Sequence, residues 1–167
     1  MTGELPEAAA IRGVTYTQET DRNHQGGTIT YDSSPPVGGA HAPVWADCTG
    51  TVYPHPIASE NAVHSLEHGA VWVTYGPGLA QGELAKLTVL VQGQDRMLLS
   101  PYPGLTSAIS LQSWGYQVRV DEASDPRITQ FVDLLRYNPE TTPEPTATCS
   151  NPEFKVHPSS PGHPLEG

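Results

Sequence analysis

The two cysteines of the chain, Cys48 and Cys149, stand about 100 residues apart and belong to no CxxC motif. A disulfide between them would close most of the chain into one loop, which in the chain-entropy description stabilises a fold by roughly 4–5 kcal/mol. A buried pair of free thiols is the alternative. We expect the disulfide, and with it an extracytoplasmic location, because such bonds form and persist in oxidising compartments.

Proline and glycine explain why this chain would need a cross-link. The 167 residues include 17 prolines and 16 glycines, so much of the backbone must form turns and irregular segments. The length suits one domain with a core of its own. We expect a globular domain over residues 19–140. A stalk or linker (1–18) would precede it, and a proline-rich tail (141–167) would be held to it by Cys149.

The charge of the chain excludes two classes of partner. Its formal net charge is -10, and so acidic a surface repels nucleic acid and anionic membranes. No apolar stretch approaches the roughly 20 residues that a membrane-spanning helix requires. We therefore expect no nucleic-acid partner and no membrane span in this sequence.

The hydrophobic pattern predicts an α+β fold, with one mixed sheet, two to three helices and long ordered loops rich in proline and glycine. Short apolar runs predict strands, at residues 70–75, 96–102, 107–114 and 116–121. The last two should form a hairpin at Gly115. Helices are expected at residues 59–68 and 125–137, with a further candidate at 78–93. The segment 32–56 is too rich in proline for a helix and is expected to be an ordered functional loop.

The helix at 125–137 has the clearest pattern in the chain. Asp125 is a suitable N-cap and Pro126 suits the first turn. Its apolar stripe is formed by Ile128, Phe131, Val132 and Leu135. We expect this stripe to pack on the sheet, where burial contributes on the order of 6–12 kcal/mol before the cost in conformational entropy.

The segment NAVHSLEHG, residues 61–69, carries the most informative polar residues. In the expected helix, which Ser59 would cap and Gly69 would end, His64 and His68 lie four residues apart and project from one face. Two imidazoles at this spacing are a common way to offer two ligands to one metal ion. Glu67 would accept a hydrogen bond from an imidazole and orient it from behind the ligands.

Further ligands must come from elsewhere in the chain. His41, held in a frame of glycine and proline, and His24 are expected to complete a set of four with His64 and His68. Met97 is a possible soft ligand if the metal is Cu(I), although a methionine in a strand is more often a core residue. His55, between two prolines, is expected in a surface loop.

Five segments together resemble the bacterial family known as domain of unknown function 3105. They are HQGGTITYDSSPPVGGAHAPVW, GTVYPHP, VHSLEHGAVWVTY, SPYPG and SWG, and the resemblance covers roughly residues 24–140. The sequence departs from the family pattern at residues 37–39, at Thr49 and in SWGY, and none of these changes affects a histidine. The resemblance implies a secreted or membrane-anchored protein and supports the histidine set.

These observations favour an extracytoplasmic protein that binds a transition metal through a histidine cluster, with copper as the first choice and zinc as the second. It would capture, buffer or deliver the ion, in exchange with a donor or acceptor protein. One alternative is a zinc-dependent hydrolase, because HSLEH matches the H-x-x-E-H pattern in which the glutamate is a general base. Another is a structural or interaction module without metal. We assign no catalytic residue and favour a non-enzymatic role.

Overall fold

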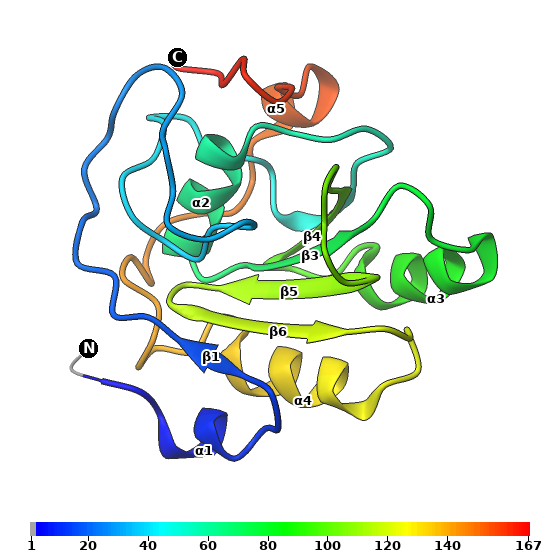
Figure 1. Ribbon diagram of the computed structural model, residues 1–167. Helices are drawn as coiled ribbons and strands as arrows, with labels where there is room; N and C mark the ends of the chain where they lie inside the picture. Colours follow the sequence, from blue (N-terminus) through cyan, green and yellow to red (C-terminus); the bar gives the residue numbers. More distant parts are fainter. Residues whose placement is uncertain (1–2) are drawn as a thin grey trace.

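Six strands form one mixed sheet in the order β1-β6-β5-β3-β4-β2 (Figure 1). The computed structural model describes residues 3–167. The strands are β1 (Thr15–Tyr16), β2 (Thr49–Val52), β3 (Val71–Tyr75), β4 (Met97–Pro101), β5 (Ile109–Ser113) and β6 (Tyr116–Val120). The helices are α1 (Pro6–Ala9), α2 (Ser59–Glu67), α3 (Gln81–Val91), α4 (Pro126–Leu135) and α5 (Pro152–Val156). The expected α+β fold is confirmed. Helices α2, α3 and α4 lie where the sequence predicts helices, and α1 and α5 are short additions.

Strand β3 lies inside the sheet, and all five of its residues are buried. It pairs in parallel with β4 and antiparallel with β5. Helix α3 connects β3 to β4, because parallel neighbours require a crossover connection. Strands β5 and β6 form the expected hairpin. Gly115 between them has a φ of +83°, a conformation that glycine adopts without a steric penalty.

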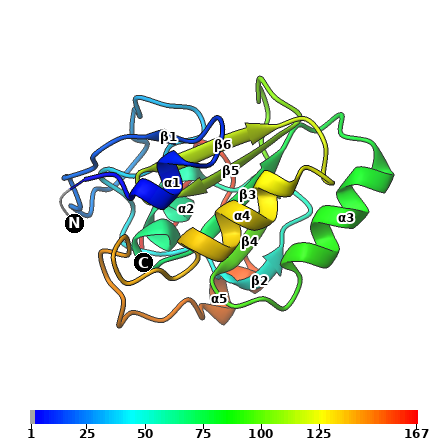
Figure 2. The same ribbon diagram turned by 90° about the horizontal axis from the view of Figure 1, so that it is seen from below.

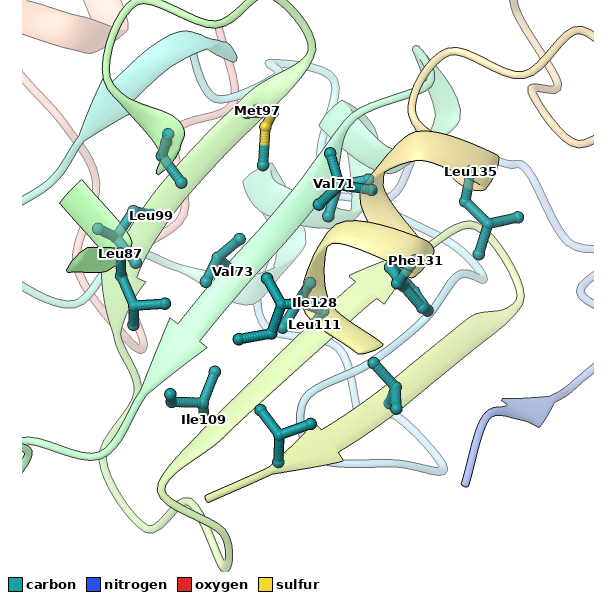
Figure 3. Close-up of a cluster of buried hydrophobic side chains, with 14 of the residues drawn as sticks. Val71, Val73, Leu87, Met97, Leu99, Ile109, Leu111, Ile128, Phe131 and Leu135 are labelled. Atoms are coloured by element: carbon teal, nitrogen blue, oxygen red, sulfur yellow. The ribbon is translucent and has the colours of Figure 1, made fainter. Parts of the chain in front are cut away.

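The two faces of the sheet bear separate cores, because successive side chains of a strand alternate between its faces. Val71 and Val73 of β3 pack under α3 and α4, together with residues such as Leu87 and Phe131 (Figures 2 and 3). Trp72 points to the opposite face, into the core that α2 shares with the C-terminal tail. The histidines of α2 are therefore separated from the core under α3 and α4 by the sheet.

Helix α4 has the expected start and the expected buried face. The Asp125 side chain caps it by accepting a hydrogen bond from the Arg127 N–H at 2.9 Å. All four residues of its apolar stripe are buried against the sheet, namely Ile128, Phe131, Val132 and Leu135. Figure 3 shows Ile128, Phe131 and Leu135. The prediction for this helix is confirmed.

Met97 does not lie with the histidines. It stands beside Val71 in the sheet register and is 1% exposed, within the core under α3 and α4 (Figure 3). Its neighbour Leu98 points to the α2 face instead. Because the sheet separates the Met97 side chain from α2, this residue is a core methionine and not a soft ligand of the histidine cluster.

Both terminal segments belong to the domain over the residues that the structure describes. The disulfide between Cys48 and Cys149 is present, as predicted. Beyond it, Phe154 of α5 is 1% exposed in the core beside α2, so the tail contributes to that core.

The N-terminal segment is not a free stalk, although we expected one. Ala8 is fully buried, and β1 pairs with β6. The Leu5 N–H also donates to the Tyr116 hydroxyl at 2.8 Å. The start of the expected stalk, residues 1–2, lies outside the described residues. Within residues 3–167, no helix has the length and apolar character needed to cross a membrane.

Candidate metal centre

Helix α2 presents His64 and Glu67 on one side, because residues three apart are neighbours on a helix surface. Both side chains are buried, with 4% of His64 and 2% of Glu67 exposed. His68 is the C-cap of the helix, not a residue of its last turn. The N-cap is Ala58, where Ser59 was expected, and its side chain makes no capping bond.

The end of α2 is fixed by a glycine, as predicted. Gly69 has a φ of +94° and its N–H donates to the Leu66 carbonyl at 2.9 Å. The Ala70 N–H donates to the Ser65 carbonyl at 3.1 Å. These two bonds form a Schellman motif, in which glycine is the preferred residue at the left-handed position.

Two loops place the other histidines beside α2. His24 and His41 form an isolated parallel β-bridge, in which the His41 N–H donates to the Asn23 carbonyl at 3.0 Å and the Gln25 N–H donates to the His41 carbonyl at 2.8 Å. His41 is fully buried and His24 is exposed. The bridge therefore holds a solvent-accessible imidazole next to a buried one.

His24, His41, His64 and Glu67 each offer one ligand atom, and these four atoms all lie within 4.8 Å of one another. The ring centroids of the histidines are 4.7 Å (His41–His64), 5.0 Å (His24–His64) and 5.2 Å (His24–His41) apart. Three of the four predicted histidine ligands thus meet. Glu67, expected behind the histidines, lies among the ligand atoms.

Hydrogen bonds to backbone carbonyls determine which nitrogen of two of these rings carries the lone pair. The Nδ1 atom of His41 bonds the Gly39 carbonyl at 2.9 Å, and that of His64 bonds the Ala42 carbonyl at 2.8 Å. Because a carbonyl oxygen can only accept, Nδ1 must carry the proton in each ring. The lone pair of a neutral ring is then on Nε2, as in histidines that bind metals through Nε2.

The contact between His41 and Glu67 is favourable only with a positive charge between the two side chains. The Nε2 atom of His41 is 3.1 Å from Oε1 of Glu67, and the Nε2 atom of His64 is 3.8 Å from the same oxygen. Since Nδ1 of His41 already donates to a carbonyl, a neutral ring would direct a lone pair at a carboxylate. Either a proton or a metal ion between the two atoms removes that repulsion.

The pKa shifts favour a neutral ring at His64 and at His68 and an ionised carboxylate at Glu67. Burial is the largest factor that lowers the pKa of His64, to about 3, and the neighbouring His41 and His68 add to it. Burial also lowers the pKa of His68. For Glu67, burial alone would raise the pKa, but the hydrogen bond with His41 and the nearby histidines hold it below its usual value. These are the protonation states that metal ligation requires.

His68 lies beside this group but outside it. Its ring centroid is 4.7 Å from that of His64, yet its Nδ1 atom bonds the Thr148 carbonyl at 2.8 Å. Among residues 3–167, it belongs instead to a second group of potential ligands with Glu67 and Glu144. The i, i+4 spacing therefore brings the rings of His64 and His68 together, but His68 does not join the group formed by His24, His41, His64 and Glu67.

Aromatic rings enclose the cluster, and the other histidines are remote from it. Trp45 packs on His64 and His68, with ring centroids 5.6 Å and 5.2 Å apart. Trp114 is 6.2 Å from His41. The remaining histidines are all exposed, namely His55, as expected for a surface loop, and His157 and His163 in the tail.

A family model described as "Protein of unknown function (DUF3105)" matches residues 22–151, which include every residue of both ligand groups. The chain belongs to the DUF3105 family. The resemblance inferred from the sequence motifs is therefore confirmed. No curated protein and no solved structure matches the chain in these comparisons.

Two features of the candidate metal centre of this DUF3105 protein were not predicted from the sequence, namely Glu67 as a potential ligand and the presence of Glu144. The spacing of His64 and Glu67, three residues apart, was a signal that the carboxylate could join the histidine as a ligand. Glu144 carried no such signal, because it lies in a proline-rich segment far from the histidines in sequence. Its position depends on the path of the tail after α4.

Proposed function

We propose that this protein binds one transition-metal ion through His24, His41, His64 and Glu67. The observation that carries the proposal is the convergence of four potential ligand atoms, two of them on buried rings whose Nδ1 atoms are committed to carbonyls. Two ligand atoms that each lie about 2.1 Å from a tetrahedral ion are about 3.4 Å apart. Glu67 Oε1 lies 3.1 Å from His41 Nε2 and 3.8 Å from His64 Nε2, distances on either side of that value.

Copper is the first choice of ion and zinc the second. Sites of nitrogen and oxygen donors bind Cu²⁺ more tightly than Zn²⁺, and imidazole suits both. A carboxylate oxygen in the set favours the divalent ions over Cu(I), which prefers soft ligands. The Cys48–Cys149 disulfide supports a location outside the reducing cytoplasm.

The role that fits such a site is capture, buffering or delivery of the ion. His24 is exposed while the other three ligands are buried, so the ion would enter and leave past this side chain. A donor or acceptor protein could then exchange the ion there. A peptidase with the H-x-x-E-H arrangement is less well supported, because it requires both His64 and His68 as ligands and Glu67 as a free base.

Calorimetric titration with Cu²⁺ and Zn²⁺ tests the proposal, on protein that carries no polyhistidine tag. His24→Ala and His64→Ala should each remove the binding of one ion per chain. His55→Ala, at an exposed histidine outside the cluster, is the matched control and should bind as the wild type does. Because His24 is exposed, its substitution tests the site without opening the core. Unchanged titrations for both His24→Ala and His64→Ala would refute the proposal.

A further inference from the structure

Glu67 belongs to two groups of potential ligands at once. The second group consists of Glu67, His68 and Glu144, whose ligand atoms also lie within 4.8 Å of one another. We propose that the Glu67 carboxylate bridges two ions, and that His68 and Glu144 hold a second divalent cation of the Zn²⁺ type. This inference rests on the proposed function, because the bridging carboxylate is a ligand of the first site.

His68 is oriented as a ligand. Only 4% of it is exposed, and its Nδ1 atom donates to the Thr148 carbonyl at 2.8 Å. The carbonyl can only accept, so a neutral ring keeps its lone pair on Nε2. A histidine whose second nitrogen is held by a backbone carbonyl is the usual arrangement in metal sites.

Glu144 is brought to this place by the backbone of the tail. Its N–H donates to the Glu67 carbonyl at 3.0 Å, which joins the tail to the end of α2. Arg96 holds the next part of the tail by donating to the Ala147 carbonyl at 2.9 Å. The Arg96 guanidinium lies 4.0 Å from the centre of the Tyr137 ring. Glu144 itself is exposed, so an ion can reach it from solvent.

The disulfide fixes the residue that orients His68. Thr148, whose carbonyl accepts from His68, directly precedes Cys149, and Cys149 is bonded to Cys48. The Cys48 N–H also donates to the Cys149 carbonyl at 3.0 Å. The second site is thus assembled by the cross-linked tail, whereas the first depends on the two loops that carry His24 and His41.

The donor sets of the two groups differ in chemistry. The first offers three imidazoles and a carboxylate, and the second offers one imidazole and two carboxylates. More oxygen donors favour a harder divalent ion, and zinc accepts both nitrogen and oxygen ligands. Protein sites that hold two metal ions place them about 3.5–4 Å apart, a separation that a shared carboxylate can span.

Native mass spectrometry of the untagged chain, loaded with Zn²⁺ and freed of excess metal, tests the inference. The wild type should retain two zinc ions. Glu144→Gln and His68→Ala should each retain one, and so should His24→Ala, which removes a ligand of the first site alone. Glu153→Gln, at another exposed glutamate of the tail, is the matched control and should retain two. Glu144 is exposed, so its substitution does not disturb the core.

Each outcome separates the two proposals. One zinc ion in the wild type, lost in His24→Ala but kept in Glu144→Gln and His68→Ala, overturns the second site and leaves the proposed function intact. One zinc ion that is lost in Glu144→Gln and His68→Ala but kept in His24→Ala overturns the proposed first site. No retained zinc in the wild type overturns the second site and excludes zinc from the first, whose binding of copper is tested separately by calorimetry.

Discussion

Backbone carbonyls decide which ring nitrogen each buried histidine can offer. The carbonyls of Gly39 and Ala42 accept from Nδ1 of His41 and His64. This assignment depends on the conformation of the loop at residues 39–42, where Gly39 has a φ of +101°. Histidine spacing in a sequence contains no information on such contacts. At the scale of residues, therefore, the sequence can indicate which side chains are candidate ligands but cannot predict how their rings are oriented.

Asp47 is a residue whose charge should stabilise the fold in a way that depends on pH. Burial alone would raise its pKa, but hydrogen bonds from Thr51, Thr49 and Asn151 outweigh burial and lower it. The folded carboxyl therefore binds its proton less tightly than the unfolded one, whose pKa is about 3.9. The stabilisation is fully present above that value and is lost as pH falls through the lowered pKa of the folded state.

Asp47→Asn should lower the free energy of unfolding at pH 7 by about 1–3 kcal/mol, since an amide replaces the buried acceptor. The gap between variant and wild type should shrink as pH falls from 5 to 2.5. Urea unfolding at both pH values measures it. A gap of the same size at pH 5 and pH 2.5 would show that the charge of Asp47 contributes nothing.

Of the residues predicted for the site, His24, His41 and His64 meet in one group of potential ligands, while their role as ligands stays a prediction. His68 is separated from them because it is the C-cap of α2 and its ring is held by Thr148. An ideal helical wheel continues the helix through His68 and so cannot show this. Met97 is a core residue, the more common position for a methionine in a strand, and not the soft ligand considered as a possibility, since strand alternation places it on the other face of the sheet.

At the scale of elements, the strong local patterns were predictive and the weak ones were not. Strand β3 is a short, continuous apolar run, and helix α4 has an apolar stripe at helical spacing. The N-terminal segment has no such period. Its two-residue strand β1 exists only because β6 lies beside it, and pairings between residues so distant in sequence are invisible in a local pattern.

Gly69 allows α2 to end where it does, and a side chain there should be costly. A Cβ atom at this position would lie 2.9 Å from Tyr137 Cδ1 and 3.0 Å from Thr142, and the residue has a φ of +94°. Gly69→Ala should destabilise the fold by at least about 1–2 kcal/mol, the cost of a left-handed backbone for a residue with a Cβ. Denaturant unfolding measures the change.

Gly82→Ala is the matched control for that variant. Gly82 lies in α3, and a Cβ atom added there would meet nothing within 4 Å, so alanine should stabilise the helix by up to about 1 kcal/mol. If Gly69→Ala and Gly82→Ala change the free energy of unfolding equally, the end of α2 does not require glycine at its left-handed position.

The tail is held by a covalent bond whose removal should be expensive. Cys48 and Cys149 are 0% and 2% exposed, so alanine is the replacement that keeps the site apolar. The double variant Cys48→Ala/Cys149→Ala should lose roughly 4–5 kcal/mol in the free energy of unfolding, as expected for a loop of this length. Urea titration at pH 7 measures it. Equal midpoints for variant and wild type would contradict the structural role assigned to the disulfide.

At the scale of the whole molecule, the acidic surface and the exposed potential ligands both favour the approach of a cation. A formal net charge of -10 attracts cations toward the protein. His24 and Glu144 are the exposed members of the two groups of potential ligands, so in the proposed role an arriving ion would meet one of them before it met the buried side chains. Affinity for metal would then depend on the fold, because the unfolded chain does not keep these side chains together.

Metal should therefore raise the thermal stability of the folded protein. An ion present at a thousandfold excess over its Kd adds about 4 kcal/mol to the free energy of unfolding. For a chain of this size that corresponds to a rise in Tm of about 8–16 °C. Differential scanning calorimetry with Zn²⁺ should show this shift in the wild type and in His55→Ala. A full shift in His64→Ala would place the stabilising ion elsewhere.

Anomalous scattering from crystals soaked separately in copper and zinc is the most direct test of the central claim. At the absorption edge of each metal, we predict a peak enclosed by His24, His41, His64 and Glu67, with ligand distances of about 2.0–2.2 Å. A map with no peak among these four residues, or with peaks only at exposed histidines such as His55 or His157, would contradict the account.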